Sequence, residues 1–487
     1  MGAADPEVAA ASGNVLVSLI YLVSAMMFIF GIKRLSKVKT ARSGNQLAAA
    51  AMGVAIIGTL LEMEKIDAGW VLVGVIVGGG IGAYAALKVE MTSMPEMVAI
   101  FNGFGGAASA LVPVAVFWQE YVVRDGPSAT VAEVMTSGNT VTVVLSVIIG
   151  GITFTGSIIA FMKLQGSLQK GNPILLPNRH LISLGLALGA LFFAWIFGFV
   201  SANAGFATFG LFFLTVISLG LGVLLVVPIG GADMPVVVSL LNSYSGVAAS
   251  MAGFVIGNPL LIVGGALVGA SGLILTNIMC VAMNRSLLNV LVGGFGQQEG
   301  SGGGGGSSEY TSVTSAGPEE AAMVLDASQS VIVVPGYGLA VAQAQHTIRE
   351  LADTLKGRGM TVKYAIHPVA GRMPGHMNVL LAEADVPYEE LVEMDDINSE
   401  FKNTDVVIVL GANDVVNPDA IDDKASPIYG MPILNAHEAR TVFVVKRSLS
   451  PGYAGIKNPL FERDNAMMLF GDAKKMIQEV LREVKEL

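Results

Sequence analysis

Long apolar stretches separated by short polar ones occupy the chain as far as about residue 292. A run of about 17 to 25 mainly apolar residues is long enough to cross the roughly 30 Å core of a bilayer as a helix. Nine such runs are present, at residues 14–32, 46–62, 69–87, 95–118, 140–163, 181–199, 206–228, 236–256 and 259–282. The pattern therefore predicts a polytopic all-α membrane domain of about nine transmembrane helices over residues 1–292.

The pattern changes at residues 293–317, a Gly/Ser-rich stretch that is predicted to form a flexible linker. Beyond it, residues 318–487 alternate short apolar runs with longer amphipathic ones. Strands are expected at Ser330–Pro335, Thr361–His367, Asp405–Gly411, Pro432–Asn435 and Thr441–Lys446, and a final helix is expected from about Asp472. This alternation is typical of a parallel sheet with helices on both faces, so an α/β Rossmann-like domain is predicted.

Loop charges predict the orientation in the membrane, because short loops rich in Lys and Arg stay in the cytoplasm. The odd-numbered loops carry the basic residues Lys33, Arg34, Lys37, Lys39, Arg42, Lys88, Lys163, Lys170 and Arg179. The even-numbered loops are acidic or nearly uncharged. We therefore expect the N-terminus outside, the C-terminal domain in the cytoplasm, and the first apolar run retained as a helix because no basic region precedes it.

Composition and charge exclude several further classes of function and site. The chain is 53% hydrophobic and 14% charged, and its net charge of −10 is divided as −1 through Gly317 and −9 beyond it. An acidic domain without a basic stripe does not suit nucleic acid. The single cysteine, Cys280, provides neither a disulfide framework nor a cysteine metal site within the chain.

The sharpest local motif is Gly336-x-Gly338-x-x-Val341, directly after the expected strand Ser330–Pro335. Glycines at these positions let a pyrophosphate approach the backbone at a helix N-terminus. The third position is valine instead of glycine or alanine, and a tight strand-to-helix turn without a ligand produces the same pattern. The motif alone thus favours a dinucleotide site without excluding the simple turn.

Two further features favour NADP over NAD. An NAD site usually has an Asp or Glu at the end of the second strand to bind the ribose 2′-hydroxyl, and residues Thr361–Arg372 contain no carboxylate. Lys446, Arg447 and Ser448 end a later strand with two cations and a hydroxyl, which suit a phosphomonoester. The alternative is a solvated basic strand end.

Several long motifs resemble proton-translocating NAD(P) transhydrogenases. The soluble ones match the NADP(H)-binding domain of that family and lie at Pro335–Gln345, Ile366–Ala384, Gly411–Pro418, Lys446–Ser448 and Gly452–Phe461. The membrane ones lie at Val89–Glu96 and Gly230–Gly246. The resemblance covers nearly the whole chain except the linker, and it implies a beta subunit with a membrane domain and an NADP(H) domain.

The resemblance also implies site residues. The implied cofactor-binding residues are Gly336, Tyr337, Gly338, Val341, Ala342, His367, Arg372, Gly411, Ala412, Asn413, Asp414, Lys446, Arg447, Ser448 and Tyr453. Asp414, expected beside the nucleotide, is the candidate catalytic side chain, and Tyr453 is expected in a loop that folds over it. Residue chemistry alone leaves Asp414 as a turn or helix-cap residue and Tyr453 as a surface aromatic.

The implied activity is direct hydride transfer from NADH to NADP⁺, coupled to inward proton movement across a bacterial inner membrane. The chain contains no second fingerprint for NAD(H). The resemblance therefore implies an alpha subunit or subunits carrying the NAD(H) domain and further membrane helices, in a dimer of alpha–beta units. A rival from another class is an ion channel or transporter gated by a cytosolic nucleotide-binding domain. A self-contained membrane reductase is disfavoured because no haem, flavin or iron–sulfur ligand set is present.

A proton path is predicted from polar residues inside the spans, which are costly unless they face a packed interior or water. Asn102, Ser157 and Asn242 each fall about 10 Å from the cytoplasmic boundary, at 1.5 Å per residue. We expect one polar layer there, with Asp233 and Glu96 at its mouth. The alternatives are hydrogen bonds between helices with no transport role, and a helix cap for Asp233. Some family members have histidine in place of Asn102. Either protons pass here by water and hydroxyl groups alone, or a membrane helix of the alpha partner contributes a titrating histidine, which is the arrangement we expect.

Overall fold

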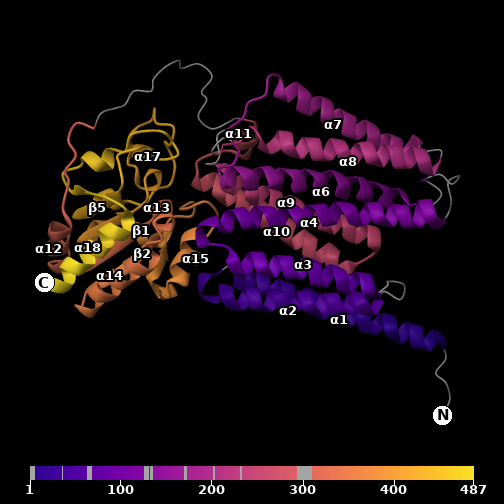
Figure 1. The fold of residues 1–487 in the computed structure, drawn as a ribbon, viewed down its shortest axis with the longest axis horizontal. Coiled ribbons are helices and arrows are strands. Elements are labelled where there is room, and N and C mark those ends of the chain that lie inside the picture. The colour runs from indigo at the N-terminus through magenta and orange to yellow at the C-terminus, as the bar shows by residue number, and fades with distance from the viewer. Residues whose placement is uncertain are drawn as a thin grey trace, which may run out of the picture. The chain divides into compact units, whose positions relative to one another are not determined.

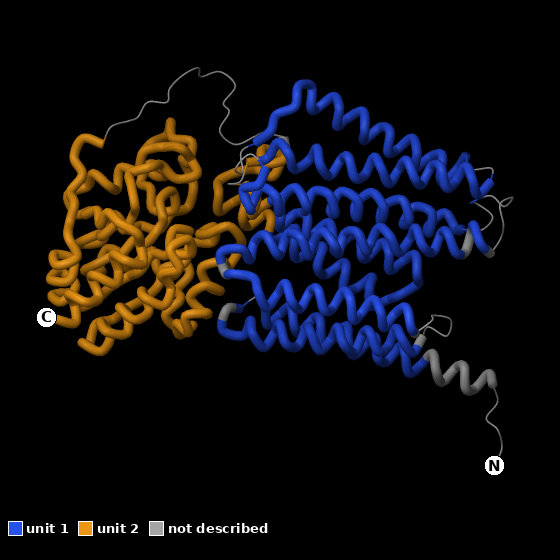
Figure 2. The backbone as a smooth tube through the Cα atoms, in the orientation of Figure 1, with its two compact units in different colours: residues 1–229, 237–275 blue, residues 230–236, 276–487 orange. Residues whose placement is uncertain are grey.

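The computed structural model describes residues 6–35, 37–62, 68–124, 131, 135–168, 173–200, 203–230, 233–292 and 310–487. The chain forms two compact units, residues 1–229 with 237–275 and residues 230–236 with 276–487 (Figure 2). The first unit is helical, and the second contains the sheet (Figure 1).

The predicted membrane helices are confirmed. Among the described residues, nine helices are long and apolar enough to cross a membrane. They are α1 (Pro6–Leu35), α2 (Val38–Glu62), α3 (Ala68–Lys88), α4 (Met94–Phe117), α6 (Ser137–Leu164), α7 (Arg179–Trp195), α8 (Ala204–Val226), α9 (Met234–Ile256) and α10 (Pro259–Ala282). Segments of π-helix extend α4 over Trp118–Arg124 and α7 over Ile196–Val200, and the short α11 (Leu287–Val292) follows α10.

Glycines let the helices of the first unit approach each other closely. A Cβ placed on Gly150 of α6 would lie 2.6 Å from the carbonyl oxygen of Gly106 on α4. A Cβ on Gly246 of α9 would lie 2.4 Å from the backbone nitrogen of Gly269 on α10. Contacts of this kind are typical of helix pairs in membranes, where packing rather than the hydrophobic effect drives association.

The α/β domain has a six-stranded parallel sheet in the order β3-β2-β1-β4-β5-β6. Its strands are β1 (Ser330–Pro335), β2 (Thr361–Ile366), β3 (Leu391–Glu393), β4 (Val406–Leu410), β5 (Thr441–Lys446) and β6 (Ala466–Phe470). The predicted Rossmann-like fold is confirmed, because this strand order is the doubly wound one with its switch point between β1 and β4.

One predicted strand is wrong. Pro432–Asn435 forms no strand, although Ile433 and Leu434 are buried in the core. Proline cannot donate a backbone hydrogen bond to a sheet, and Leu434 N–H instead donates to the Val415 carbonyl at 2.9 Å. The segment is therefore a loop whose apolar side chains pack under the sheet. Strands β3 and β6 were not predicted.

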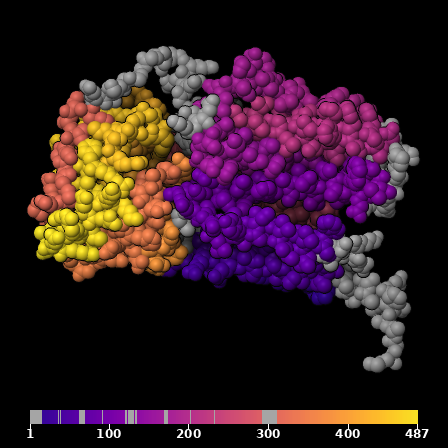
Figure 3. Space-filling view, in the orientation of Figure 1, coloured from indigo at the N-terminus to yellow at the C-terminus, as the bar shows by residue number. Residues whose placement is uncertain are grey.

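Helices cover the sheet on one face, and short helices and loops cover the other. Helices α12 (Pro318–Asp326), α14 (Gln345–Gly357) and α18 (Ala473–Glu486) pack together, with α14 against β2 and α18 against β5. The C-terminal residues, shown in yellow, lie at the surface of this unit (Figure 3). The core on the other face contains Val334, Val409 and Val444. It is enclosed by α16 (Met394–Ile397), α17 (Asp419–Asp422) and the Pro432–Asn435 loop.

The predicted flexible linker falls largely outside the described residues, which resume at Tyr310. From there the chain runs beside β6, and Ser315 pairs with Met468 in a parallel bridge. The last eight residues of the 293–317 stretch, from Tyr310 on, are thus described and include contacts with the sheet.

Candidate functional site

The carboxyl ends of β1 and β4 meet at the switch point of the sheet with almost no side chain between them. Gly336 N–H donates to the Leu410 carbonyl at 2.9 Å, and Gly338 N–H donates to the Gly411 carbonyl at 3.0 Å. A Cβ on Gly336 would lie 2.4 Å from that Gly411 oxygen, and a Cβ on Gly338 would lie 2.6 Å from the Gly411 Cα. Both positions therefore require glycine, and Gly411 itself has φ of +70°.

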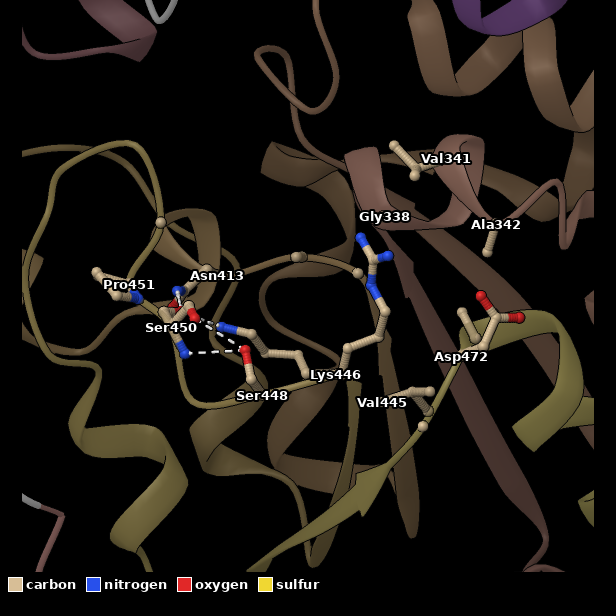
Figure 4. A pocket seen from close by; sticks show the side chains of 16 residues that line it. Gly338, Val341, Ala342, Asn413, Val445, Lys446, Ser448, Ser450, Pro451 and Asp472 are labelled. Carbon is tan, nitrogen blue, oxygen red and sulfur yellow. Dashed lines mark hydrogen bonds between the residues drawn. The ribbon is translucent and has the colours of Figure 1, made fainter. Parts of the chain in front are cut away.

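A cavity of about 280 Å³ opens beside this crossing (Figure 4). Its lining residues are Gly338, Val341, Ala342, Gly411, Ala412, Asn413, Val445, Lys446, Arg447, Ser448, Ser450, Pro451, Gly452, Gly471, Asp472 and Ala473. Figure 4 shows Lys446, Ser448, Ser450 and Asn413 gathered on one side, with Val341, Ala342 and Asp472 on the other. The cavity, which we call the cleft, thus has a polar end with ammonium, hydroxyl and amide groups, and an opposite end with two apolar side chains and the Asp472 carboxylate.

The polar end is built on the end of β5. The Lys446 ammonium donates to the Ser450 carbonyl at 2.8 Å and lies 4.8 Å from the centre of the Phe461 ring. Burial lowers the pKa of Lys446 to about 8, although the nearby Asp414 carboxylate acts to raise it. Arg447 and Ser448 are exposed, and the Ser448 and Ser450 hydroxyls are 2.8 Å apart. This end therefore offers two cations and two hydroxyls to an anion.

Asp414 and Tyr453 lie behind the cleft lining. The Asp414 carboxylate is buried and accepts a hydrogen bond from Ala454 N–H at 3.1 Å. Burial raises the pKa of Asp414 against the opposing effect of its hydrogen bonds. A Cβ on Gly452 would lie 2.2 Å from Asp414 Oδ2, so the loop after β5 passes directly over the carboxylate. The Tyr453 hydroxyl donates to the Met431 sulfur at 3.3 Å.

Four other predicted residues lie outside the lining. Gly336 caps α13 (Tyr337–Val341) and contributes backbone only. The Arg372 guanidinium lies 4.4 Å from the centre of the Tyr337 ring. His367 is buried with Nε2 2.9 Å from the Pro432 carbonyl oxygen, and burial lowers the pKa of His367 to about 4. The structure thus places His367 in the core, against the Pro432 carbonyl.

In the membrane unit, two of the predicted polar residues meet. Asn102 on α4 donates to the Ser157 hydroxyl on α6 at 3.1 Å, and Ser157 is buried. A Cβ on Gly103 would lie 3.1 Å from the Ser157 Cβ, so the two helices are in close contact here. Asn242 on α9 has an exposed side chain in this chain. The structure therefore links Asn102 with Ser157 and leaves Asn242 facing outward.

Asp233 lies just before α9, within the second unit. It is buried, and its carboxylate is 3.7 Å from the Arg285 guanidinium. Burial raises the pKa of Asp233 to about 6, and the charge of Arg285 opposes this rise. The predicted mouth residue is thus a buried member of an ion pair.

Sequence comparison assigns the family. The profile of the family described as NAD(P) transhydrogenase beta subunit matches residues 17–483. NAD(P) transhydrogenase subunit beta of Rhodospirillum rubrum is 48% identical over 462 residues, covering 95% of this chain and 97% of that protein. The same values hold for the protein of Rhodospirillum rubrum strain ATCC 11170. This chain belongs to the NAD(P) transhydrogenase beta subunit family. The resemblance stated from the motifs is confirmed.

Part of the cleft of this beta-subunit family member was not predicted. The unpredicted lining residues are Val445, Ser450, Pro451, Gly452, Gly471, Asp472 and Ala473. Gly471 and Asp472 follow β6, and Asp472 caps α18 by accepting from Lys475 N–H at 3.3 Å. Because the carboxyl ends of parallel strands share one edge of the sheet, recognising β6 would have brought these residues into the site.

A buried lysine in the membrane unit of this beta subunit was also missed. Lys163, at the end of α6, donates to the carbonyls of Val227 and Ile229 at 2.5 Å each. These carbonyls follow the C-terminus of α8, where the helix dipole favours a cation. Sequence analysis assigned Lys163 to a cytoplasmic loop because it lies at the very end of its apolar run.

Proposed function

We propose that the cleft binds NADP(H), with the 2′-phosphate at Lys446, Arg447 and Ser448. The observation that carries this proposal is the pairing of two cations and a hydroxyl at the end of β5 with the close glycine crossing of β1 and β4. The end of β2 supports it, because Thr361–Arg372 offers no carboxylate to a ribose 2′-hydroxyl. A beta subunit of an NAD(P) transhydrogenase is expected to hold this cofactor.

The residues present fit a dinucleotide phosphate. Gly336, Gly338 and Gly411 let the turn after β1 and the loop after β4 cross closely, and Gly338 and Gly411 present backbone without side chains to the cleft, where we place the pyrophosphate. Arg447 is exposed and able to form the bidentate contact that guanidinium makes with phosphate. Asp414 lies behind the lining, where its carboxylate holds the Gly452–Ala454 loop through the Ala454 N–H. Asp414 therefore serves the predicted site by fixing the loop that covers it.

The proposed reaction is hydride transfer from NADH to NADP⁺, and the bound cofactors supply that chemistry. This chain binds and orients the NADP(H) half, while an alpha subunit carries the NAD(H) domain and further membrane helices. The proposed assembly is a dimer of alpha–beta units in a bacterial inner membrane, with the N-terminus outside and the α/β domain in the cytoplasm. Loop charge supports that orientation.

We further propose that inward proton movement drives the reaction toward NADPH. Moving one charge through about 150 mV releases roughly 3.5 kcal/mol, which shifts an equilibrium by a few hundredfold. The hydrogen-bonded pair Asn102 and Ser157 supports a polar route through α4 and α6. Asp233 is proposed at its inner mouth, and Asn242, exposed on α9, is proposed to face membrane helices of the alpha partner. A gated channel has no specific observation in its favour.

The test is binding of NADP⁺ and NAD⁺ by calorimetry to the full chain in detergent, with and without Arg447→Ala. Arg440→Ala is the matched control, because Arg440 precedes the same strand at the opposite edge of the sheet and is exposed. We expect strong preference for NADP⁺ in the wild type and the control, and loss of that preference in Arg447→Ala. Equal binding of NAD⁺ and NADP⁺ by the wild type would refute the proposed function.

A further inference from the structure

The last residues of the 293–317 linker lie along the edge strand β6. Ala316 N–H donates to the Met468 carbonyl at 3.0 Å, and Met468 N–H donates to the Thr314 carbonyl at 2.8 Å. We call Tyr310–Ala316 the strap. It adds a short stretch of parallel pairing to the sheet edge, so its position is fixed relative to the strands.

The first residues of the strap contact one loop, Lys457–Glu462. The Tyr310 hydroxyl accepts a hydrogen bond from Asn458 N–H at 3.1 Å, and its ring stacks on Phe461 with centroids 5.9 Å apart. Thr311 N–H donates to Glu462 at 2.6 Å. A stacked ring pair and two hydrogen bonds from backbone N–H groups to side chains thus join the strap to a loop about 150 residues later in the chain.

The same loop supports the polar end of the cleft from behind. Phe461 lies beneath the Lys446 ammonium, 4.8 Å from ring centre to nitrogen. The Asn458 side chain donates to the Asn413 carbonyl at 3.1 Å. Lys446 and Asn413 both line the cleft. Tyr310 therefore contacts Phe461, whose ring contacts the cation proposed to bind the 2′-phosphate. Tyr310 also contacts Asn458, whose side chain is hydrogen-bonded to the loop after β4.

We infer that Tyr310 is a positioning residue of the NADP(H) site, acting through Phe461 on Lys446. The inference rests on the proposed function. The Tyr310 ring limits where the Phe461 ring can lie, and the Phe461 face in turn holds the ammonium by a cation–π contact. Tyr310 lies in the linker sequence and not in a strand of the sheet, so a linker residue and the cofactor site share one set of contacts.

The experiment measures NADP⁺ affinity of the full chain in detergent for Tyr310→Leu and Tyr310→Phe. Tyr388→Leu is the matched control, since Tyr388 is a half-buried tyrosine just before β3, at the far edge of the sheet. We expect about tenfold weaker binding for Tyr310→Leu, from loss of the ring pair, and about threefold weaker binding for Tyr310→Phe, from loss of the hydroxyl. The control should stay within about twofold.

A double-mutant cycle separates positioning from general stability. In a Lys446→Met background, Tyr310→Leu should weaken NADP⁺ binding by no more than about twofold, because the group it positions is gone. An equal loss in both backgrounds, or unchanged affinity in Tyr310→Leu, overturns the inference. If Tyr310→Leu does not fold, the same cycle with Tyr310→Met, which also removes the ring but fills more of its space, decides the question. Failure of the wild type to bind NADP⁺ would instead count against the proposed function.

Discussion

The charge of Lys446 should make NADP⁺ affinity depend on pH in the alkaline range. Burial lowers the pKa of Lys446 from 10.5 to about 8, so in the free protein the ammonium loses its proton above about pH 8. The protonated form is the one that binds a phosphate. The affinity should therefore be full below about pH 8 and should fall above it by up to tenfold per pH unit.

The size of the fall is bounded by what the charged contact contributes. A hydrogen bond to a charged group contributes about 1.5 to 3 kcal/mol, which corresponds to about 10- to 150-fold in affinity. The decline should thus level off within about two decades. A 2′-phosphate has its own second pKa near about 6, so the measurements belong above about pH 7, where the ligand carries its full charge.

The assay is calorimetric titration of NADP⁺ from about pH 7 to pH 10, repeated in two buffers with different ionisation enthalpies to count protons. Near pH 8.5 the wild type should take up more than roughly half a proton on binding. Lys446→Arg should bind without this uptake, because arginine stays charged throughout the range. A flat pH profile in the wild type, or an alkaline decline that persists in Lys446→Arg, would refute the reasoning.

Two further predictions concern stability. The unfolded chain protonates His367 below about pH 6.5, but burial lowers the folded pKa to about 4, so stability should fall by about 3 kcal/mol as pH drops through this window. Thermal unfolding should show this loss in wild type and in His346→Gln, an exposed control, but not in His367→Gln. Gly246→Val should cost about 1 to 3 kcal/mol, because its Cβ meets the Gly269 backbone at 2.4 Å. Gly79→Val, with no neighbour within 4 Å, should leave the melting midpoint in detergent unchanged, and equal midpoints for both would contradict the packing argument.

Hydrophobicity alone predicted the helices of the membrane unit, because few kinds of backbone structure are stable in lipid. A spanning segment must satisfy its backbone hydrogen bonds internally, so a long apolar run becomes a helix. The nine predicted runs and the nine long apolar helices found among the described residues coincide to within a turn or two at most ends. The apolar runs did not predict which helices contact one another. Lys163 shows why, because its two carbonyl partners belong to the end of another helix.

The α/β domain was predicted where the local signal and the tertiary structure agree. Strands β1, β2, β4 and β5 are rich in valine and isoleucine and are followed by turn residues. Strand β6 contains Met467 and Met468 and no β-branched residue, and β3 has only three residues, so neither carried a local strand signal. Pro432–Asn435 carried the apolar signal of a strand, but that apolarity serves burial of a loop.

The candidate site also contains some residues that could be predicted from the sequence and others that could not. Gly338, Gly411 and Lys446 were predictable because each lies at a strand end, where the sheet brings separate motifs to one edge. Phe461 and Tyr310 were not, because their roles depend on a contact between segments far apart in sequence. Motif reading therefore finds the residues that face a ligand and misses those that hold them in place.

Lys446 and Arg447 lie at the end of β5, so the proposed nucleotide site differs from the usual dinucleotide fold in which strand would recognise the ribose. In the usual dinucleotide fold the ribose beside the adenine is recognised at the end of β2. Here β2 ends at Ile366, and the next residue, His367, is buried against the Pro432 carbonyl and has no free edge toward a ligand. The cations end β5, on the other side of the β1–β4 switch point in the strand order. Selectivity for a 2′-phosphate is therefore expected from the end of β5, with Lys446 and Arg447, and not from the end of β2.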